Sequence, residues 1–400
     1  MPQFLDNRPT PGAIAKSKRA QLRPLGSPFE RNTPHVKTRK FVAIGAALGV
    51  AIAGISASAP AMADPVSSSY VLVGSDTLDA AVNALANGTA VTGATVRVTA
   101  NGNPIASFDA FGSAAIQTKP NGPYFGRPSG SGNGVTALRR SIDGAAWTAP
   151  SNTTPAKVIT GQIDIARSSS GPGSNANAAG QLLYVPFARD AVSYAYKGGG
   201  SGIEALTAAQ LKEIYECTTT SIGGTPVTPR LPQNGSGTRS FFLAAIGVTT
   251  PGACVNATAT TLPENDGTAI TDGQIIPFSV AQWIAQANGV QGVNTTAGVS
   301  LGSALGGTAP TTGTVPNMAA NPTYYANTTF GRDTYLVVEY KRVNPSDPAY
   351  DAALAGLVDS SSATSLTSFG SLSSSPGAVK KKFGFLAPST NSTQRAFLNL

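Results

Sequence analysis

Three short segments of small and hydroxyl-bearing residues are candidates for binding chemistry in this 400-residue chain. They are residues 74–77 (GSDT), 130–134 (GSGNG) and 235–239 (GSGTR), and each precedes apolar residues at helical spacing. A helix N-terminus offers unpaired N–H groups and the positive end of the helix dipole, while Ser and Thr add hydroxyl donors. The pattern predicts a site for a small anion or polar ligand, although ordinary helix capping explains any single loop.

The loops require strands before them and helices after them. Apolar runs predict strands at 69–73, 94–98, 163–166, 182–187, 191–196, 275–278 and 334–340, and helical spacing predicts helices near 78–85, 135–142, 207–215, 240–246 and 280–287. Thr207 is the expected N-cap of the third helix. The alternation predicts an α/β fold with mixed, mostly parallel sheets. Residues 289–329 and 360–378 are rich in small polar residues and are expected to form long surface loops.

Several catalytic classes are excluded by the residues that the chain lacks. The one histidine is His35, so residues 64–400 offer none for a Ser-His-Asp or Cys-His site or for a zinc ligand. No G-x-S-x-G motif is present, and the acidic residues form no evident catalytic pair. The GSGNG run lacks the third glycine of a dinucleotide fingerprint. We therefore expect a binding protein without a cofactor rather than an enzyme, and a secreted hydrolase is disfavoured.

The positive charge of the chain is concentrated in its first 40 residues. The net charge of +8 and the pI near 9.5 would ordinarily suggest nucleic acid or a membrane surface as a partner. Residues 1–40 contain nine Lys and Arg against two acidic residues, and residues 41–63 carry no charge, which leaves 19 basic and 18 acidic residues in 64–400. Binding of nucleic acid is therefore not expected.

A signal peptide is predicted at the N-terminus. Residues 37–63 (KTRKFVAIGAALGVAIAGISASAPAMA) combine a basic start, an apolar run and a small-x-small ending. A transmembrane anchor is the alternative, but the strongly apolar part is short for a span. We expect cleavage near Ala63 and a protein that is secreted or held in the cell envelope.

The chain contains two cysteines, Cys217 and Cys254. In an oxidising compartment an even number of cysteines predicts a disulfide, here one that closes a loop of about 37 residues. A metal site is the alternative, but two cysteines without a histidine make a poor ligand set.

Over residues 64–345 the chain resembles the phosphate-binding proteins of bacterial phosphate ABC transporters, which have the class 2 periplasmic-binding fold, and most closely their secreted actinobacterial branch. The order of the three loops and the NGSGTR segment carry most of the resemblance. The matching stretches are YVLVGSDTLDAAVNAL (70–85), RPSGSGNGVTALRRSI (127–142), QIDIARSSSGP (162–172), LLYVPFARDAVSYAY (182–196), LTAAQLKEIYEC (206–217), TPVTPRLPQNGSGTRSFF (225–242) and IIPFSVAQWIAQANG (275–289).

The resemblance implies that phosphate lies between two lobes and is held by backbone amides and hydroxyl groups. The positions of this chain that match the family's motif are Ser75, Asp76 and Thr77 in the first loop, Ser131 in the second, and Ser236, Gly237 and Thr238 in the third.

Two positions depart from the family's pattern. Ser169 stands where the family has an aspartate that accepts the proton of hydrogen phosphate, and Pro232 stands where it has an arginine. On a regular strand Arg167 and Ser169 point to the same face, so Arg167 is expected to supply the positive charge unless it pairs with a surface carboxylate. Arg239 is a second candidate unless it is simply solvated.

Other residues have a structural and a functional interpretation. Asp266 is expected in a turn, although it could also cap a helix or line the cleft. The aromatic residues Tyr124, Phe125, Trp147 and Trp283 could stack on a sugar, but such residues more often belong to the core.

Together these observations predict a two-lobed α/β binding protein. Residues 1–63 form the leader, residues 64–190 and 331–400 the first lobe, and residues 191–330 the second, with hinge crossings near 186–193 and 328–336. The expected function is capture of phosphate or a related small anion by a monomer that serves an ABC permease. The alternative is an exported, wall-associated interaction protein of the same fold that has lost or changed its ligand.

Overall fold

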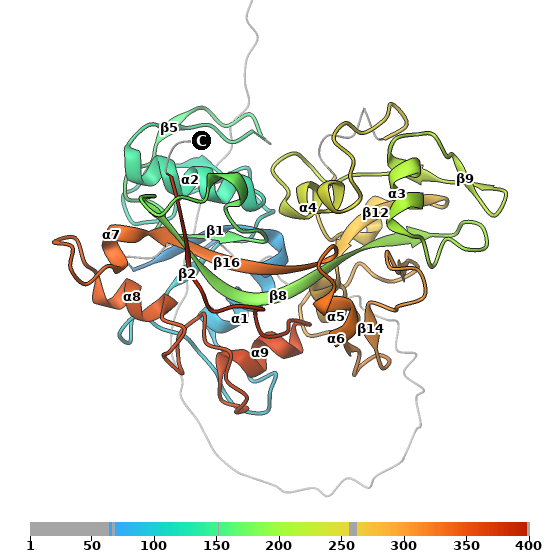
Figure 1. The fold of residues 1–400 in the computed structure, drawn as a ribbon. Helices are drawn as coiled ribbons and strands as arrows, with labels where there is room; N and C mark the ends of the chain where they lie inside the picture. Colours follow the sequence, from blue (N-terminus) through green and yellow to red (C-terminus); the bar gives the residue numbers. More distant parts are fainter. Residues whose placement is uncertain (1–63, 66–68, 151, 256–261, 398–400) are drawn as a thin grey trace, which may run out of the picture. The chain divides into compact units, whose positions relative to one another are not determined.

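The computed structural model describes residues 64–65, 69–150, 152–255 and 262–397. Within them, nine strands form one mixed sheet whose main order is β11-β12-β8-β16-β7-β1-β2, with β13 and β17 also paired to β8 (Figure 1). These strands are β1 (Val71–Gly74), β2 (Ala106–Ser107), β7 (Ile165–Ser168), β8 (Leu182–Lys197), β11 (Thr228–Pro229), β12 (Gln274–Ser279), β13 (Ser300–Gly302), β16 (Gly331–Glu339) and β17 (Gln394–Ala396).

Four further strand pairs are short two-stranded sheets in the described part of the chain. They are β3 (Ala115–Ile116) with β4 (Phe125–Gly126), β5 (Ala146–Trp147) with β6 (Lys157–Val158), β9 (Ser221–Ile222) with β10 (Thr225–Pro226), and β14 (Thr311–Thr312) with β15 (Ala319–Ala320).

The helices cover the main sheet and follow the glycine-rich loops. They are α1 (Asp76–Asn87), α2 (Ser131–Asp143), α3 (Ala208–Tyr215), α4 (Gly237–Ala245), α5 (Val280–Ala287), α6 (Pro322–Ala326), α7 (Tyr340–Val343), α8 (Ala352–Val358) and α9 (Pro376–Lys382), with 3₁₀ turns η1 (Gly173–Asn175) and η2 (Gly267–Ala269). Thr207 caps α3, as predicted, and also forms a capping box with Gln210. No helix in the described part of the chain is both long and apolar enough to cross a bilayer.

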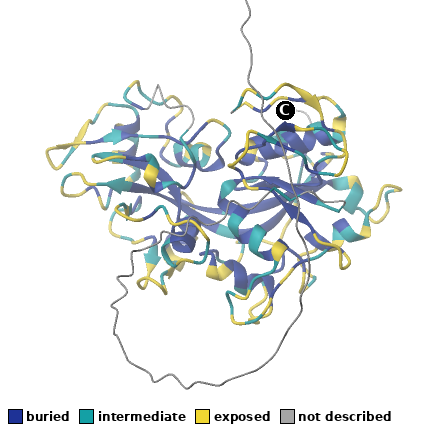
Figure 2. Cartoon of the chain, turned by 180° about the vertical axis from the view of Figure 1, so that it is seen from behind, coloured by how far each residue is buried: buried dark blue, intermediate teal, exposed yellow. Residues whose placement is uncertain are grey.

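Strand β8 joins two regions of the hydrophobic core. Its first half pairs with β16 and its second half with β12 and β13. Around the first half, side chains alternate between the two faces of the sheet, so that Leu72 and Ile165 pack on the α1 side and Val73 and Ala166 on the α2 side. Around the second half, Val192 and Tyr194 pack with α3 and α4. Figure 2 shows the sheet as a continuous buried layer.

The predicted α/β class and mixed sheet are confirmed, but the balance of pairing differs. The pairs β1–β2, β1–β7 and β11–β12 are parallel, whereas β8 pairs antiparallel with β12, β13, β16 and β17. Strand β16, which comes later in the chain, lies between β8 and β7 and runs antiparallel to both, so the pairing at the centre of the sheet is antiparallel.

Several element boundaries differ from the sequence-based expectation. The expected strand at 94–98 is not formed, although Val96 and Val98 are buried. The two strands expected at 182–187 and 191–196 are one strand, because the charged residue Asp190 between them is buried with Arg332 as its partner. Helices α8 and α9 lie beyond the stretch that resembles the family and were missed. The predicted signal peptide lies outside the described residues.

Candidate functional site

The three glycine-rich loops meet, because glycines allow their backbones to touch. A side chain at Gly134 would lie 2.5 Å from the Cα of Gly74, and one at Gly130 would lie 2.5 Å from the carbonyl oxygen of Gly235. Gly132 N also donates to Gly235 O at 3.2 Å. A Cβ at Gly134 or Gly130 would clash with backbone that cannot move aside. The predicted convergence of the loops is therefore present.

Hydroxyl groups from these loops gather around the guanidinium of Arg332 on β16. Nη2 donates to Thr238 Oγ1 at 2.8 Å and to Thr77 Oγ1 at 3.2 Å, and Nη1 donates to Ser169 Oγ at 3.3 Å. The hydroxyls of Ser131 and Ser169 lie 2.9 Å apart. We call Thr77, Ser131, Ser169, Thr238 and Arg332 the hydroxyl–arginine cluster; all are buried.

The charge of Arg332 is balanced by Asp190 on β8. Nε and Nη2 donate to Asp190 Oδ2 at 3.1 and 2.8 Å, and both side chains are almost fully buried. The other oxygen of Asp190 accepts from Ser279 Oγ and from Ala281 N in the first turn of α5, each at 3.0 Å. Asp190 thus links β8, β16 and the start of α5.

A carboxylate also enters the cluster. Glu264 Oε1 accepts from Thr238 Oγ1 at 2.6 Å and from Thr77 Oγ1 at 3.1 Å. Each threonine has one hydroxyl hydrogen, so these hydrogens are directed at Glu264 and not at an outside anion. The position of an oxyanion beside the two threonines is therefore held by a carboxylate of the chain itself.

Of the predicted ligand residues, Thr77, Ser131, Ser169 and Thr238 are in the cluster. Gly237 adjoins it, because a Cβ there would lie 2.2 Å from Ser169 Oγ. The remaining predicted residues have other roles, which are described next.

Ser236 and Ser75 occupy the N-cap positions of two helices. Ser236 Oγ accepts from Arg239 N and caps α4. Ser75 lies at the N-cap of α1, but its buried hydroxyl has no hydrogen-bond partner among the described residues. Asp76 turns away from the cluster, and its Oδ2 accepts from Asn265 Nδ2 at 2.7 Å.

The predicted arginines do not reach the cluster. Strand β7 ends at Ser168, so Arg167 and Ser169 do not continue one regular strand. The fully buried guanidinium of Arg167 donates to Ser75 O, Ser107 Oγ and Phe108 O. Burial lowers its pKa, and the nearby carboxylates of Asp79 and Asp109 oppose that shift.

Arg239 lies on the first turn of α4. Its Nη1 donates to Pro232 O at 2.9 Å, and burial lowers its pKa. The guanidinium that meets the loop hydroxyls is therefore that of Arg332, which the sequence-based prediction did not include.

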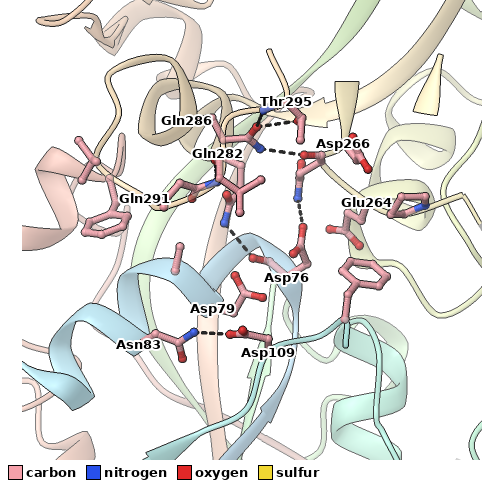
Figure 3. Close-up of a pocket in the computed structure, with 18 of the residues that line it drawn as sticks. Asp76, Asp79, Asn83, Asp109, Glu264, Asp266, Gln282, Gln286, Gln291 and Thr295 are labelled. Atoms are coloured by element: carbon pink, nitrogen blue, oxygen red, sulfur yellow. Dashed lines mark hydrogen bonds between the residues drawn. The ribbon is translucent and has the colours of Figure 1, made fainter. Parts of the chain in front are cut away.

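A cavity of about 600 Å³ lies beside the cluster (Figure 3). Helix α1, helix α5 and the segments around residues 109–111, 263–266 and 290–295 form its walls. Its polar lining is rich in carboxyl and amide groups: Asp76, Asp79, Asn83, Asp109, Glu264, Asn265, Asp266, Gln282, Gln286 and Gln291. Gln282 Nε2 donates to the carbonyls of Asp76 and Thr77 and so ties α5 to α1.

The carboxyl groups in this cavity perturb one another. Burial raises the pKa of Asp76 well above its usual value, and the charges of Asp79 and Glu264 add to the shift. Burial also raises the pKa of Asp79 to about 7, with Arg167 opposing and Asp109 adding to the shift. Burial and the negative charge of neighbouring carboxylates both disfavour the ionised form of each carboxyl group.

The Asp79 shift predicts a dependence of stability on pH. Because the folded pKa is about 7 and the unfolded pKa near 4, folding favours the protonated form, and this stabilisation is lost as pH rises from about 4 through 7. Relative to Asp79→Asn, the free energy of unfolding of the wild type should fall by roughly 3–4 kcal/mol over that range, because each pKa unit corresponds to about 1.4 kcal/mol. Urea unfolding at pH 4, 5.5, 7 and 8 measures it, and a pH-independent difference would contradict the assignment.

The remaining predicted residues are mostly structural. Asp266 caps the 3₁₀ helix η2 through Thr268 N and borders the cavity, so the capping and lining alternatives hold rather than the favoured plain turn. Phe125, Trp147 and Trp283 are buried in the core, whereas Tyr124 is exposed.

The predicted disulfide between Cys217 and Cys254 is present. No group of three or more His, Cys, Asp or Glu in the described part of the chain is arranged to hold a metal ion.

Three residues of the site were missed: Asp190, Glu264 and Arg332. Two of them are charged residues next to or within apolar strand sequences, Asp190 in 182–197 and Arg332 at the start of 331–339. A charge at such a position suggests a buried pair, and this is the signal that could have indicated them. Glu264 lies in an irregular segment and carries no comparable signal.

No family model matches the chain, and no curated protein matches it. Solved structures with a similar fold include a candidate phosphate ABC transporter substrate-binding protein from Clostridium perfringens with bound phosphate (14% identity, 80% of this chain and 98% of that chain, TM-score 0.46). Another is an ABC-type phosphate transport receptor from Vibrio cholerae (15% identity, 80% of this chain and 100% of that chain, TM-score 0.43). A third is a phosphate-binding protein from Stenotrophomonas maltophilia (15% identity, 81% of this chain and 91% of that chain, TM-score 0.43). At these identities and TM-scores the likeness says nothing about the ligand of this chain.

Proposed function

We propose that this protein is an exported, non-enzymatic solute-binding protein that captures phosphate or a related small oxyanion for an ABC permease. The observation that supports this proposal is the meeting of Arg332 with Thr77, Ser169 and Thr238, which are contributed by three separate segments of the chain. A buried guanidinium surrounded by hydroxyl groups is a suitable donor set for an oxyanion. The lobes would be residues 64–190 with 331–400, and residues 191–330.

Capture of an oxyanion requires the hydroxyls of Thr77 and Thr238 to turn away from Glu264. The negative charge of Glu264 would repel the incoming anion at a separation of a few ångströms, a penalty of about 4 kcal/mol for unit charges 4 Å apart near a protein surface. Neutralising Glu264 should therefore strengthen the binding of phosphate.

Isothermal titration calorimetry of the full chain with phosphate, and with sulfate as a second anion, tests the proposal. We expect Glu264→Gln to bind phosphate at least about tenfold more tightly than the wild type. Glu213→Gln is the matched control, because Glu213 is exposed on α3, away from the cluster. Absence of heat with either anion, in both the wild type and Glu264→Gln at millimolar ligand, would overturn the oxyanion proposal.

A second candidate is a binding or wall-associated interaction protein of the same fold whose ligand has changed. Glu264 accepts hydrogen bonds from the hydroxyls of both Thr77 and Thr238. This favours the second candidate, because a carboxylate of the chain occupies the position that a bound anion would take. The carboxyl-rich cavity beside the cluster also favours a ligand other than phosphate.

A further inference from the structure

The cavity beside the hydroxyl–arginine cluster has a strongly one-sided charge. Among the described residues, five carboxyl groups line it: Asp76 and Asp79 on α1, Asp109 just after β2, and Glu264 and Asp266 in the segment before η2 (Figure 3). Among the described residues that line it there is no Lys, Arg or His. A cavity with such a lining concentrates cations and excludes anions.

One carboxylate oxygen in this cavity lacks a donor. Glu264 is 2% exposed, and its Oε2 has no hydrogen-bond partner among the described residues, although Oε1 accepts from two threonines. Figure 3 shows the Glu264 side chain directed into the cavity. A buried carboxylate oxygen without a donor is costly, so a donor supplied by a ligand is the expected partner.

We propose that this cavity binds an aliphatic di- or polyamine, with one ammonium group on Glu264 and another on the Asp79 and Asp109 side. The inference rests on the proposed solute-binding role and names the ligand class of its second candidate. An ammonium group provides up to three donors and one positive charge, whereas the described lining has no positively charged side chain and leaves Glu264 Oε2 without a donor.

The size and walls of the cavity favour an organic cation over a metal ion. A volume of about 600 Å³ is within the range of sites for organic ligands, and no described group of three or more carboxylates is arranged around a single point that could hold a metal. Side chains of Ala80, Phe111, Val290, Val293 and Phe383 supply apolar wall for methylene groups. A neutral sugar would leave the repulsion among the carboxylates in place.

Binding of the amine should be linked to release of protons. The groups that face Asp79 are Asp76 on its own helix, Asp109, and the guanidinium of Arg167 behind it, and Glu264 faces Asp76 from the opposite wall. The raised pKa values of Asp76 and Asp79 mean that a cation must draw protons off these groups. Affinity should therefore rise between pH 5.5 and pH 8.

The test is calorimetry of the full chain with spermidine and putrescine, with glucose and MgCl₂ as the neutral and metal probes. We expect heat with at least one amine, affinity that is at least about fivefold higher at pH 8 than at pH 5.5, and no heat with glucose or Mg²⁺. Titrations in buffers of different ionisation enthalpy should show net release of protons to the buffer.

Two isosteric variants and one control locate the site. Glu264→Gln and Asp79→Asn should each weaken amine binding by more than about tenfold, because each removes a buried charge partner. Asp143→Asn should leave it unchanged within about twofold, since Asp143 is exposed, pairs with Arg140 and does not line the cavity. Circular dichroism of each variant confirms that it is folded.

The outcomes separate this inference from the oxyanion proposal, because Glu264→Gln should weaken amine binding and strengthen phosphate binding. Phosphate binding without amine binding overturns the inference alone. Amine binding without phosphate binding overturns the oxyanion candidate alone, and absence of both overturns both. Amine binding that Glu264→Gln and Asp79→Asn leave intact also overturns the inference, because the amine then binds elsewhere.

Discussion

Replacing Arg332 by methionine should lower the free energy of unfolding by about 3–5 kcal/mol. Asp190 is fully buried, and the substitution leaves its charge without a counter-ion. It also removes the donor that Thr77, Ser169 and Thr238 share. Urea unfolding followed by circular dichroism measures the change.

Two companion variants show whether the lost charge pair is the cause. Adding Asp190→Asn to the Arg332 variant should recover a large part of the stability, because the buried charge is then gone. Arg140→Met is the matched control, since Arg140 pairs with Asp143 at an exposed position on α2 and should cost less than about 1 kcal/mol. An Arg332→Met cost as small as that of Arg140→Met would contradict the central role of the pair.

Loss of the disulfide between Cys217 and Cys254 should lower the free energy of unfolding by about 3–4 kcal/mol. The bond has a sequence separation of 37 residues and joins the end of α3 to the segment after α4. Without it, the unfolded chain regains the conformational freedom of that loop. The double variant Cys217→Ser, Cys254→Ser and the wild type under a reductant should show the same loss in urea unfolding.

Comparing the double variant with the reduced wild type separates loss of the disulfide from any local effect of the serine substitutions. Cys217 has a φ of +65°, a conformation that serine tolerates no better than cysteine, so the double variant does not relieve backbone strain. If reduction of the wild type leaves the unfolding curve unchanged, the disulfide does not contribute to stability and the prediction is wrong.

Local sequence predicted much of the fold. The strand, glycine-rich loop and helix at 71–87, and the loop and helix units at 130–143 and 235–245, follow from apolar periodicity and from glycine, whereas the short strands β4 and β11 before the second and third loops were not located. These signals act over a few residues, and local propensity is strongest there. Strand pairing was less predictable: the antiparallel pairing of β8 with β16 depends on contacts between segments about 150 residues apart in the chain.

The candidate site was predicted in part. Thr77, Ser131, Ser169 and Thr238 were selected from loop composition and from position within the resemblance, and the structure brings them together. Arg167 was selected because a regular strand would place it with Ser169, but β7 ends at Ser168 and the guanidinium turns to Ser75 and Phe108 instead. A change of backbone direction over one residue is not visible in the spacing of residue types.

By itself the sequence determined which segments carry the hydroxyl groups, that two cysteines would pair, and that most of the positive charge lies in the first 40 residues. The tertiary structure decided which charges meet those hydroxyl groups. Arg332 is 255 residues from Thr77, and Glu264 is 187 residues from it. Contacts over such separations depend on how glycines let the loops touch and how β8 and β16 pair, so no local pattern specifies them.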